Sequence, residues 1–274
     1  MSTLKQITVN DTVLNYSDVG NGVPFIFVHG AAASCNHVVY LQDDLRMHAR
    51  VISYSQRFHL PNNPNDNGVF GPDQHAKDLI ALMDALHIDK AVVFGHSYGA
   101  LVATTAAILS PEKVMHLFLA EPTLPLLINN RPEYTNVVDV RKETFDDIKR
   151  TFLSGNPANA VKQLLDYAIG GKGFNTLPEE IRRDMIANAA ALYQLVFNQV
   201  PPEISTPENI ANLKMPVSIL LGEKCTPMYS AVGLELKRLI PSTVIHYFND
   251  VAHDLIYNAA EDCARVVVEE CKWV

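Results

Sequence analysis

Short apolar runs and stretches of helical periodicity alternate along most of this chain. Polar and apolar residues alternate on both sides of Asn10-Asp11, which predicts an antiparallel hairpin over residues 6–9 and 12–18. A strand covered on both faces is predicted at the wholly apolar run 24–28, and another buried strand at 114–120. Further strands are predicted at 50–54 and at the apolar run 91–94. Helical spacing of apolar or small residues follows two of these positions, over 72–87 and 101–109. The pattern predicts an α/β fold with a mostly parallel sheet flanked by helices.

The alternation stops between residues 122 and 215, where helical patterns dominate at 144–153, 158–169 and 178–200. It then resumes with predicted strands at 216–221 and 243–248 and helices at 228–239 and 259–268. An insertion of helices between two sheet strands explains this break most simply. We therefore expect residues 1–121 and 216–274 to form the core domain. Residues 122–215 are expected to form a helical cap over an active site.

A candidate nucleophile lies in Gly95-His96-Ser97-Tyr98-Gly99, between a predicted strand and a predicted helix. Glycine removes the side chain where the strand and helix backbones crowd a sharp turn, and a serine between two such glycines projects its hydroxyl out of the sheet. This context predicts a nucleophile elbow. The alternative is a serine in a tight turn that performs no chemistry.

Composition narrows the possible partners and the compartment. The 274 residues are 48% hydrophobic and 19% charged, with a net charge of −8 and both signs mixed along the chain. A nucleic-acid partner or an anionic membrane surface is therefore not expected. The four cysteines lack the spacing of a zinc site or a disulfide framework, and the first residues lack the apolar core of a signal peptide. We expect a cytoplasmic protein without a metal site.

Three motifs occur in an informative order: Phe27-Val28-His29-Gly30, the elbow, and Asn249-Asp250-Val251-Ala252-His253 after the last predicted strand. With them the chain resembles the α/β-hydrolase superfamily over essentially its whole length. The resemblance implies Ser97 as nucleophile and His253 as the base that takes its proton. It also implies that His29 and His96 shape the backbone. An ordinary loop histidine is the alternative for position 253.

The acid of the expected triad departs from the common pattern. Most relatives carry Asp three residues after the glycine that ends the strand at 216–221, and here that position is Cys225. A thiol is neutral near pH 7 and cannot supply the charge-assisted hydrogen bond of a carboxylate. Glu121, at the end of the preceding strand, is our preferred acid, and this placement is similar to that in zearalenone lactonases. Glu223 is the rival, and the absence of a functional acid is the third alternative.

The resemblance assigns the oxyanion hole to the backbone N–H groups of Ala31 and Tyr98. It gives Arg57 a structural hydrogen-bonding role. In the cap, we expect core packing rather than a ligand pocket to explain the aromatic and methionine residues Phe152, Tyr167, Phe174, Met185 and Tyr193.

The expected function is that of a serine hydrolase that needs no cofactor and cleaves a small, largely apolar ester or lactone through an acyl-enzyme. Because the nucleophile is Ser and not Asp, the resemblance argues against haloalkane dehalogenase and epoxide hydrolase chemistry. Two alternatives stay open: another reaction on the same fold, such as C–C hydrolysis, a lyase reaction or cofactor-free dioxygenation, and a ligand receptor with little turnover. The expected partner is a small-molecule substrate. The natural substrate and the oligomeric state do not follow from the sequence.

Overall fold

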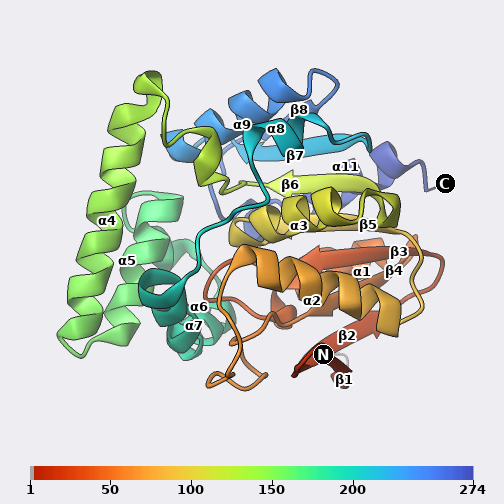
Figure 1. The fold of residues 1–274 in the computed structure, drawn as a ribbon, viewed down its shortest axis with the longest axis horizontal. Coiled ribbons are helices and arrows are strands. Elements are labelled where there is room, and N and C mark those ends of the chain that lie inside the picture. The colour runs from red at the N-terminus through yellow and green to blue at the C-terminus, as the bar shows by residue number, and fades with distance from the viewer. Residues whose placement is uncertain (1–2, 274) are drawn as a thin grey trace.

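A computed structural model describes residues 3–273 and contains an eight-stranded sheet (Figure 1). The strand order is β1-β2-β4-β3-β5-β6-β7-β8, with β1–β2 and β2–β4 antiparallel and every other pair parallel. The strands are β1 (Lys5–Val9), β2 (Thr12–Val19), β3 (Val23–Val28), β4 (Ala49–Tyr54), β5 (Ala91–His96), β6 (Val114–Ala120), β7 (Val217–Gly222) and β8 (Val244–Phe248). The predicted hairpin and mostly parallel sheet are confirmed.

Two hydrophobic cores lie on opposite faces of the sheet because its central strands are apolar on both faces. The first core contains α2 (Pro72–Ala85), α3 (Tyr98–Leu109) and α9 (Pro227–Leu239). The second contains α1 (Val39–Leu45), α10 (Leu255–Asn258) and α11 (Ala260–Cys271), together with part of the 3-10 turn η1 (Cys35–Val38). A further 3-10 turn, η2 (Pro111–Lys113), connects α3 to β6. The expected α/β layering of the sheet between helices is therefore present.

Strand register aligns the carboxyl ends of the four central strands. Val28 at the end of β3 pairs with Gly95 of β5, and Gly95 pairs with Leu119 of β6. Ala120 in turn pairs with Leu220 of β7. The turns that follow these strands therefore lie along one edge of the sheet, where ligands bind in open α/β sheets.

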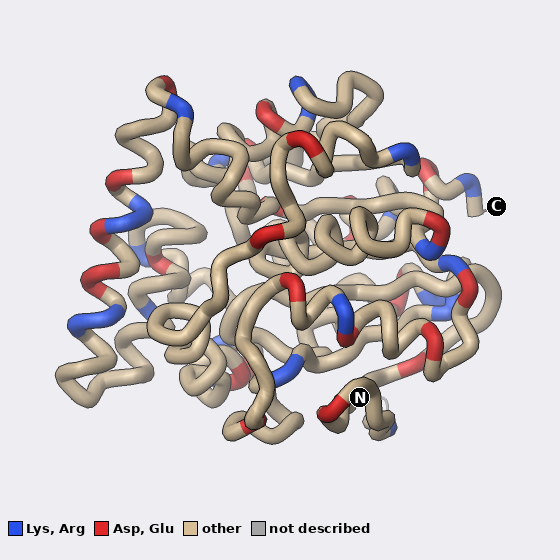
Figure 2. The backbone as a smooth tube through the Cα atoms, in the orientation of Figure 1, with Lys and Arg blue, Asp and Glu red and all other residues tan. Residues whose placement is uncertain are grey.

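The segment between β6 and β7 contains η3 (Pro125–Leu127), η4 (Pro132–Tyr134), α4 (Thr135–Leu153), α5 (Pro157–Ile169), η5 (Gly173–Thr176), α6 (Glu179–Ala187), α7 (Ala189–Tyr193), the π-helical turn η6 (Gln194–Asn198) and α8 (Pro207–Ala211). Helices α4 to α7 lie beyond that edge of the sheet, at the left of Figure 1, whereas α8 packs beside α9 and α3. Acidic and basic residues alternate along α4 (Figure 2). The domain boundaries at 121/122 and 215/216 stay predictions.

Two helix predictions in this region need correction. The helix predicted over 178–200 is broken at Asn188, whose side-chain Oδ1 accepts a hydrogen bond from the backbone N–H of Leu60 at 2.7 Å. The helix predicted from residue 144 begins earlier, at Thr135. In its first turns Val137 and Val138 are only half-buried against the first core, and most of the residues around them are exposed, so the apolar spacing there is weak. Among the described residues, we find no helix whose length and apolarity would let it cross a membrane.

Candidate active site

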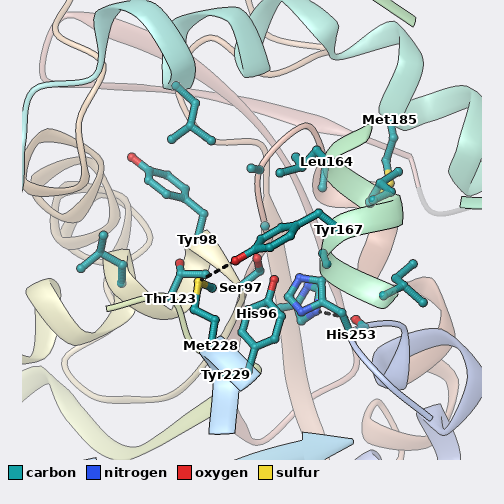
Figure 3. Close-up of a pocket in the computed structure, with 18 of the residues that line it drawn as sticks. His96, Ser97, Tyr98, Thr123, Leu164, Tyr167, Met185, Met228, Tyr229 and His253 are labelled. Carbon is teal, nitrogen blue, oxygen red and sulfur yellow. Dashed lines mark hydrogen bonds between the residues drawn. The ribbon is translucent and has the colours of Figure 1, made fainter. Parts of the chain in front are cut away.

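Ser97 occupies the turn between β5 and α3 with φ 56° and ψ −119°. Such positive φ values are costly for a residue with a Cβ and persist only where the surroundings enforce them. Both flanking glycines are required here, since a Cβ at Gly95 would lie 2.5 Å from the Gly99 carbonyl oxygen and one at Gly99 would lie 2.1 Å from that of Val28. The strand and helix thus press together around Ser97. Its side chain is directed into a cavity (Figure 3).

Glu121 directly follows β6, the strand next to the elbow strand, and also has a positive φ of 47°. Its side chain is fully buried. One carboxyl oxygen, Oε1, accepts a hydrogen bond from the backbone N–H of Gly222 at 2.7 Å. Because Gly222 ends β7, this bond fixes the carboxyl group against the neighbouring strand.

His253 lies in the loop after β8, and its ring faces Glu121. Its Nδ1 lies 3.5 Å from Glu121 Oε2, at the outer limit of a hydrogen bond. The Tyr229 ring stacks on the imidazole, with centroids 4.3 Å apart and planes 17° apart. On another side, His96 Nε2 donates to the His253 carbonyl oxygen at 3.1 Å, as the dashed line in Figure 3 marks. These contacts hold the imidazole at the cavity that Ser97 lines.

Burial dominates the electrostatics of this pair. Desolvation lowers the pKa of His253 to about 3, which outweighs the opposite effect of Asp254. Desolvation also raises the pKa of Glu121 to about 8, against the lowering effect of the Gly222 N–H. Both directions follow from the cost of a charge away from water. The imidazole is therefore neutral at neutral pH, which is the form able to accept a proton.

The two backbone segments assigned to the oxyanion hole border the same cavity. Tyr98 is the first residue of α3, so the helix provides no partner for its backbone N–H. The turn that carries Ala31 lies against the nucleophile, since a Cβ at Gly30 would lie 3.1 Å from Ser97 Cβ. Ala31 and Tyr98 both line the cavity. An oxygen bound near Ser97 would thus lie between two backbone segments.

The cavity measures about 860 Å³ with its open mouth included. The turns at the sheet edge supply Ser97 and two histidines. The inserted segment supplies the polar residues Arg141 and Gln199 and most of the apolar ones, among them Leu164 and Tyr167 from α5 and Met185 from α6 (Figure 3). The prediction that cap aromatic and methionine residues pack a core is wrong for Tyr167, which borders the cavity. Met185 is buried in the second core as predicted and also borders the cavity. Phe152 and Tyr193 instead pack edge to face, with ring centroids 5.6 Å apart.

The sequence profile described as alpha/beta hydrolase fold matches residues 23–201. The chain belongs to the α/β hydrolase fold family. An sn-1-specific diacylglycerol lipase of Danio rerio is 24% identical over 260 residues, covering 89% of this chain and 77% of the lipase. Two solved structures share the fold: an esterase from Thermogutta terrifontis (TM-score 0.76, 20% identity, 99% and 98% of the two chains) and an enol-lactonase from Burkholderia xenovorans (TM-score 0.75, 18% identity, 97% and 98%).

Glu223, the alternative candidate for the triad acid, does not line the cavity. Its side chain is exposed, and its Oε2 is 3.5 Å from the backbone nitrogen of Asp250. Cys225 is half-buried and contacts Ser230, with Sγ and Oγ 3.0 Å apart. Burial raises the pKa of this thiol, and the nearby Glu121 carboxyl raises it further. Of these three side chains, only Glu121 contacts His253 within residues 3–273.

Two other side chains have the structural roles that the family resemblance implied. The buried ring of His29 accepts from the Gln56 backbone N–H at 2.9 Å and has its Nδ1 2.8 Å from the Gly30 carbonyl oxygen. Arg57 has a fully buried guanidinium that pairs with Asp78, Asp66 and Asp11 at 2.7–2.9 Å.

The stacking of the Tyr229 ring on His253 could not be predicted from the sequence, because no local pattern distinguishes Tyr229 from other aromatic residues at a helix start. Across the described part of the chain, no cluster of three or more His, Cys, Asp or Glu residues could hold a metal ion.

Proposed function

We propose that this protein is a serine hydrolase that cleaves a small, largely apolar ester or lactone through an acyl-enzyme. The observation that carries the proposal is the convergence of three side chains: Ser97 at a strained turn and His253 both border one apolar cavity, and Glu121 contacts the far side of the imidazole. A serine hydroxyl is a weak nucleophile, and it needs a base oriented by a third group. The esterase and the enol-lactonase of the same fold support this class of reaction.

In the proposed mechanism, Ser97 Oγ attacks the carbonyl carbon while His253 Nε2 takes the hydroxyl proton. Ionised Glu121 accepts a hydrogen bond from Nδ1–H and so stabilises the imidazolium that forms. The backbone N–H groups of Tyr98 and Ala31 bind the oxyanion of the tetrahedral intermediate. Its collapse expels the alcohol, which receives the proton from His253. Water, activated by the same imidazole, then releases the acid and restores Ser97.

The experiment combines a fluorophosphonate probe with turnover of short-chain p-nitrophenyl esters. We expect the wild-type protein to be labelled and to release nitrophenolate repeatedly, and Ser97→Ala to do neither. Ser154→Ala is the matched control, because Ser154 is exposed on the surface after α4. It should behave as the wild type does.

Two results would argue against a serine ester hydrolase. Labelling of Ser97 without ester turnover would support a receptor or another reaction at the same serine. Unchanged turnover in Ser97→Ala would reject the serine mechanism altogether.

A further inference from the structure

Arg141 brings a positive charge into an otherwise uncharged cavity. It extends from α4 and lines the cavity that Ser97 and His253 border. The other described lining residues include no Lys, Asp or Glu, and burial keeps the lining histidines His96 and His253 neutral near pH 7. An arginine remains protonated in proteins. The described lining therefore holds one full charge, and it is positive.

This guanidinium is not neutralised by the described part of the protein. Within residues 3–273, no carboxylate forms a salt bridge with it, and no side chain or carbonyl oxygen accepts a hydrogen bond from it. Its contact is with the Phe145 ring, whose centroid lies 5.0 Å from the guanidinium carbon. Burial lowers its pKa, and the ionisable groups that oppose this effect are the hydroxyls of Tyr167 and Tyr229, which are neutral near pH 7.

Arg57 shows what a buried structural arginine needs in the same chain. Three carboxylates surround its guanidinium, because burying a charge without a partner is expensive. Arg141 is partly buried and has no such partner among residues 3–273, and its side chain borders the cavity that Ser97 lines. The N–H donors of the Arg141 guanidinium are thus available to a ligand.

We propose that Arg141 binds a carboxylate carried by the substrate, so that the enzyme acts on small esters or lactones with a free carboxylate group apart from the scissile bond. The inference rests on the proposed function and names its substrate class. A guanidinium presents paired N–H donors that match a carboxylate in a two-bond contact. One guanidinium balances one carboxylate charge, whereas a phosphate dianion would keep excess charge in an apolar cavity.

The test uses mono-p-nitrophenyl esters of butanedioic, hexanedioic and octanedioic acids, which keep one free carboxylate. Each is compared with the neutral compound of the same chain length in which that carboxylate is a methyl ester. In the wild type, we expect kcat/KM for at least one acid to exceed that for its methyl ester. Arg141→Gln should lower this ratio by about tenfold to a hundredfold, the factor expected when a charged hydrogen-bonding partner is lost. Arg141→Lys, which keeps the charge and loses the paired donors, should lie between the two.

Arg150→Gln is the matched control. It removes another guanidinium from the same helix, but Arg150 is exposed and pairs with Asp147. The ratio should therefore not change. An equal change in both variants would mean a general charge effect, and an unchanged ratio in Arg141→Gln would overturn the inference.

A binding measurement separates this inference from the proposed function. Calorimetry on Ser97→Ala with the three diacids should show the monomethyl ester of at least one of them binding more tightly than its dimethyl ester, and Arg141→Gln in the same background should remove that preference. If no ester is hydrolysed but this preference is present, the proposed function fails and the carboxylate site stands. If esters are hydrolysed and neither kcat/KM nor binding depends on Arg141 for any chain length, the carboxylate site is wrong and the proposed function stands.

Discussion

Replacing Glu121 with glutamine isolates the contribution of the proposed triad acid. The substitution keeps the size of the side chain and an amide oxygen that can accept from the Gly222 N–H. The amide NH₂ would then face His253 Nδ1, which would have to accept a hydrogen bond. The ring proton would move to Nε2, the atom that must take the proton of Ser97. Glu121→Gln therefore favours the wrong tautomer without removing any other group.

The size of the activity loss can be estimated from this change of tautomer. The equivalent Asp→Asn change in serine proteases costs about 10⁴ in kcat. The separation of 3.5 Å between His253 Nδ1 and Glu121 Oε2 exceeds the usual length of a charge-assisted hydrogen bond, so the carboxylate contributes less than the full effect. We expect kcat/KM to fall by about 10²–10⁴, which corresponds to roughly 3–5 kcal/mol of barrier.

The assay is p-nitrophenyl ester hydrolysis, with thermal unfolding as the test of folding. Burial raises the pKa of Glu121, so ionising this carboxyl in the folded state costs stability as the pH rises toward about 8. Glu121→Gln should therefore unfold at a temperature no lower than the wild type at pH 8. Glu223→Gln, which changes an exposed carboxylate, should retain wild-type activity. Near-wild-type turnover in Glu121→Gln, or an equal loss in Glu223→Gln, would refute the assignment.

Three further predictions concern the titration of Glu121, the packing at Gly222 and the buried ion pairs of Arg57. First, kcat/KM should rise with pH through an apparent pKa well above that of an ordinary glutamate and toward about 8, because protonated Glu121 would donate to Nδ1 and leave the proton on Nε2; a profile already flat from pH 5 upward would contradict the direction of the shift. Second, Gly222→Ala should lower kcat/KM by at least about 10², since its Cβ would lie 2.4 Å from the Val251 carbonyl oxygen in the loop that leads to His253. In the control Gly233→Ala, the nearest atom to the Cβ would be the movable end of Leu221 at 3.0 Å, and equal activity loss in both would show a nonspecific effect. Third, urea unfolding should show that Arg57→Gln costs about 3–5 kcal/mol because it leaves buried Asp78 unpaired. The partly exposed pair of Arg50 with Asp18 should cost about 1 kcal/mol when Arg50→Gln removes it, and equal costs would contradict this reasoning.

The fold and the proposed reactive groups could be predicted where a local pattern reflects a steric requirement. Gly95 and Gly99 around Ser97 reveal the elbow because both positions meet neighbouring backbone. Glu121 could be proposed because the register of a parallel sheet brings consecutive strand ends together, so that a carboxylate after one strand can reach a loop after another. These inferences need no knowledge of how distant helices pack.

The cavity wall could not be predicted because it depends on such packing. Arg141 lies before the helix that apolar spacing predicts, and its position at the cavity follows from the way α4 packs on the rest of the fold. The break at Asn188 depends on a hydrogen bond to Leu60, which is 128 residues away in the sequence. Helical periodicity reports the buried face of a helix but not the element that covers it.

The proposed mechanism requires Ser97 to form a covalent acyl intermediate with the help of His253. Rapid acid quenching of the protein with p-nitrophenyl butyrate, followed by peptide mass analysis, would detect this intermediate. We expect a butyryl group on the peptide that contains Ser97, no such group in Ser97→Ala, and much slower formation in His253→Gln. An acyl group on Cys225, or unimpaired hydrolysis by Ser97→Ala, would contradict this mechanism.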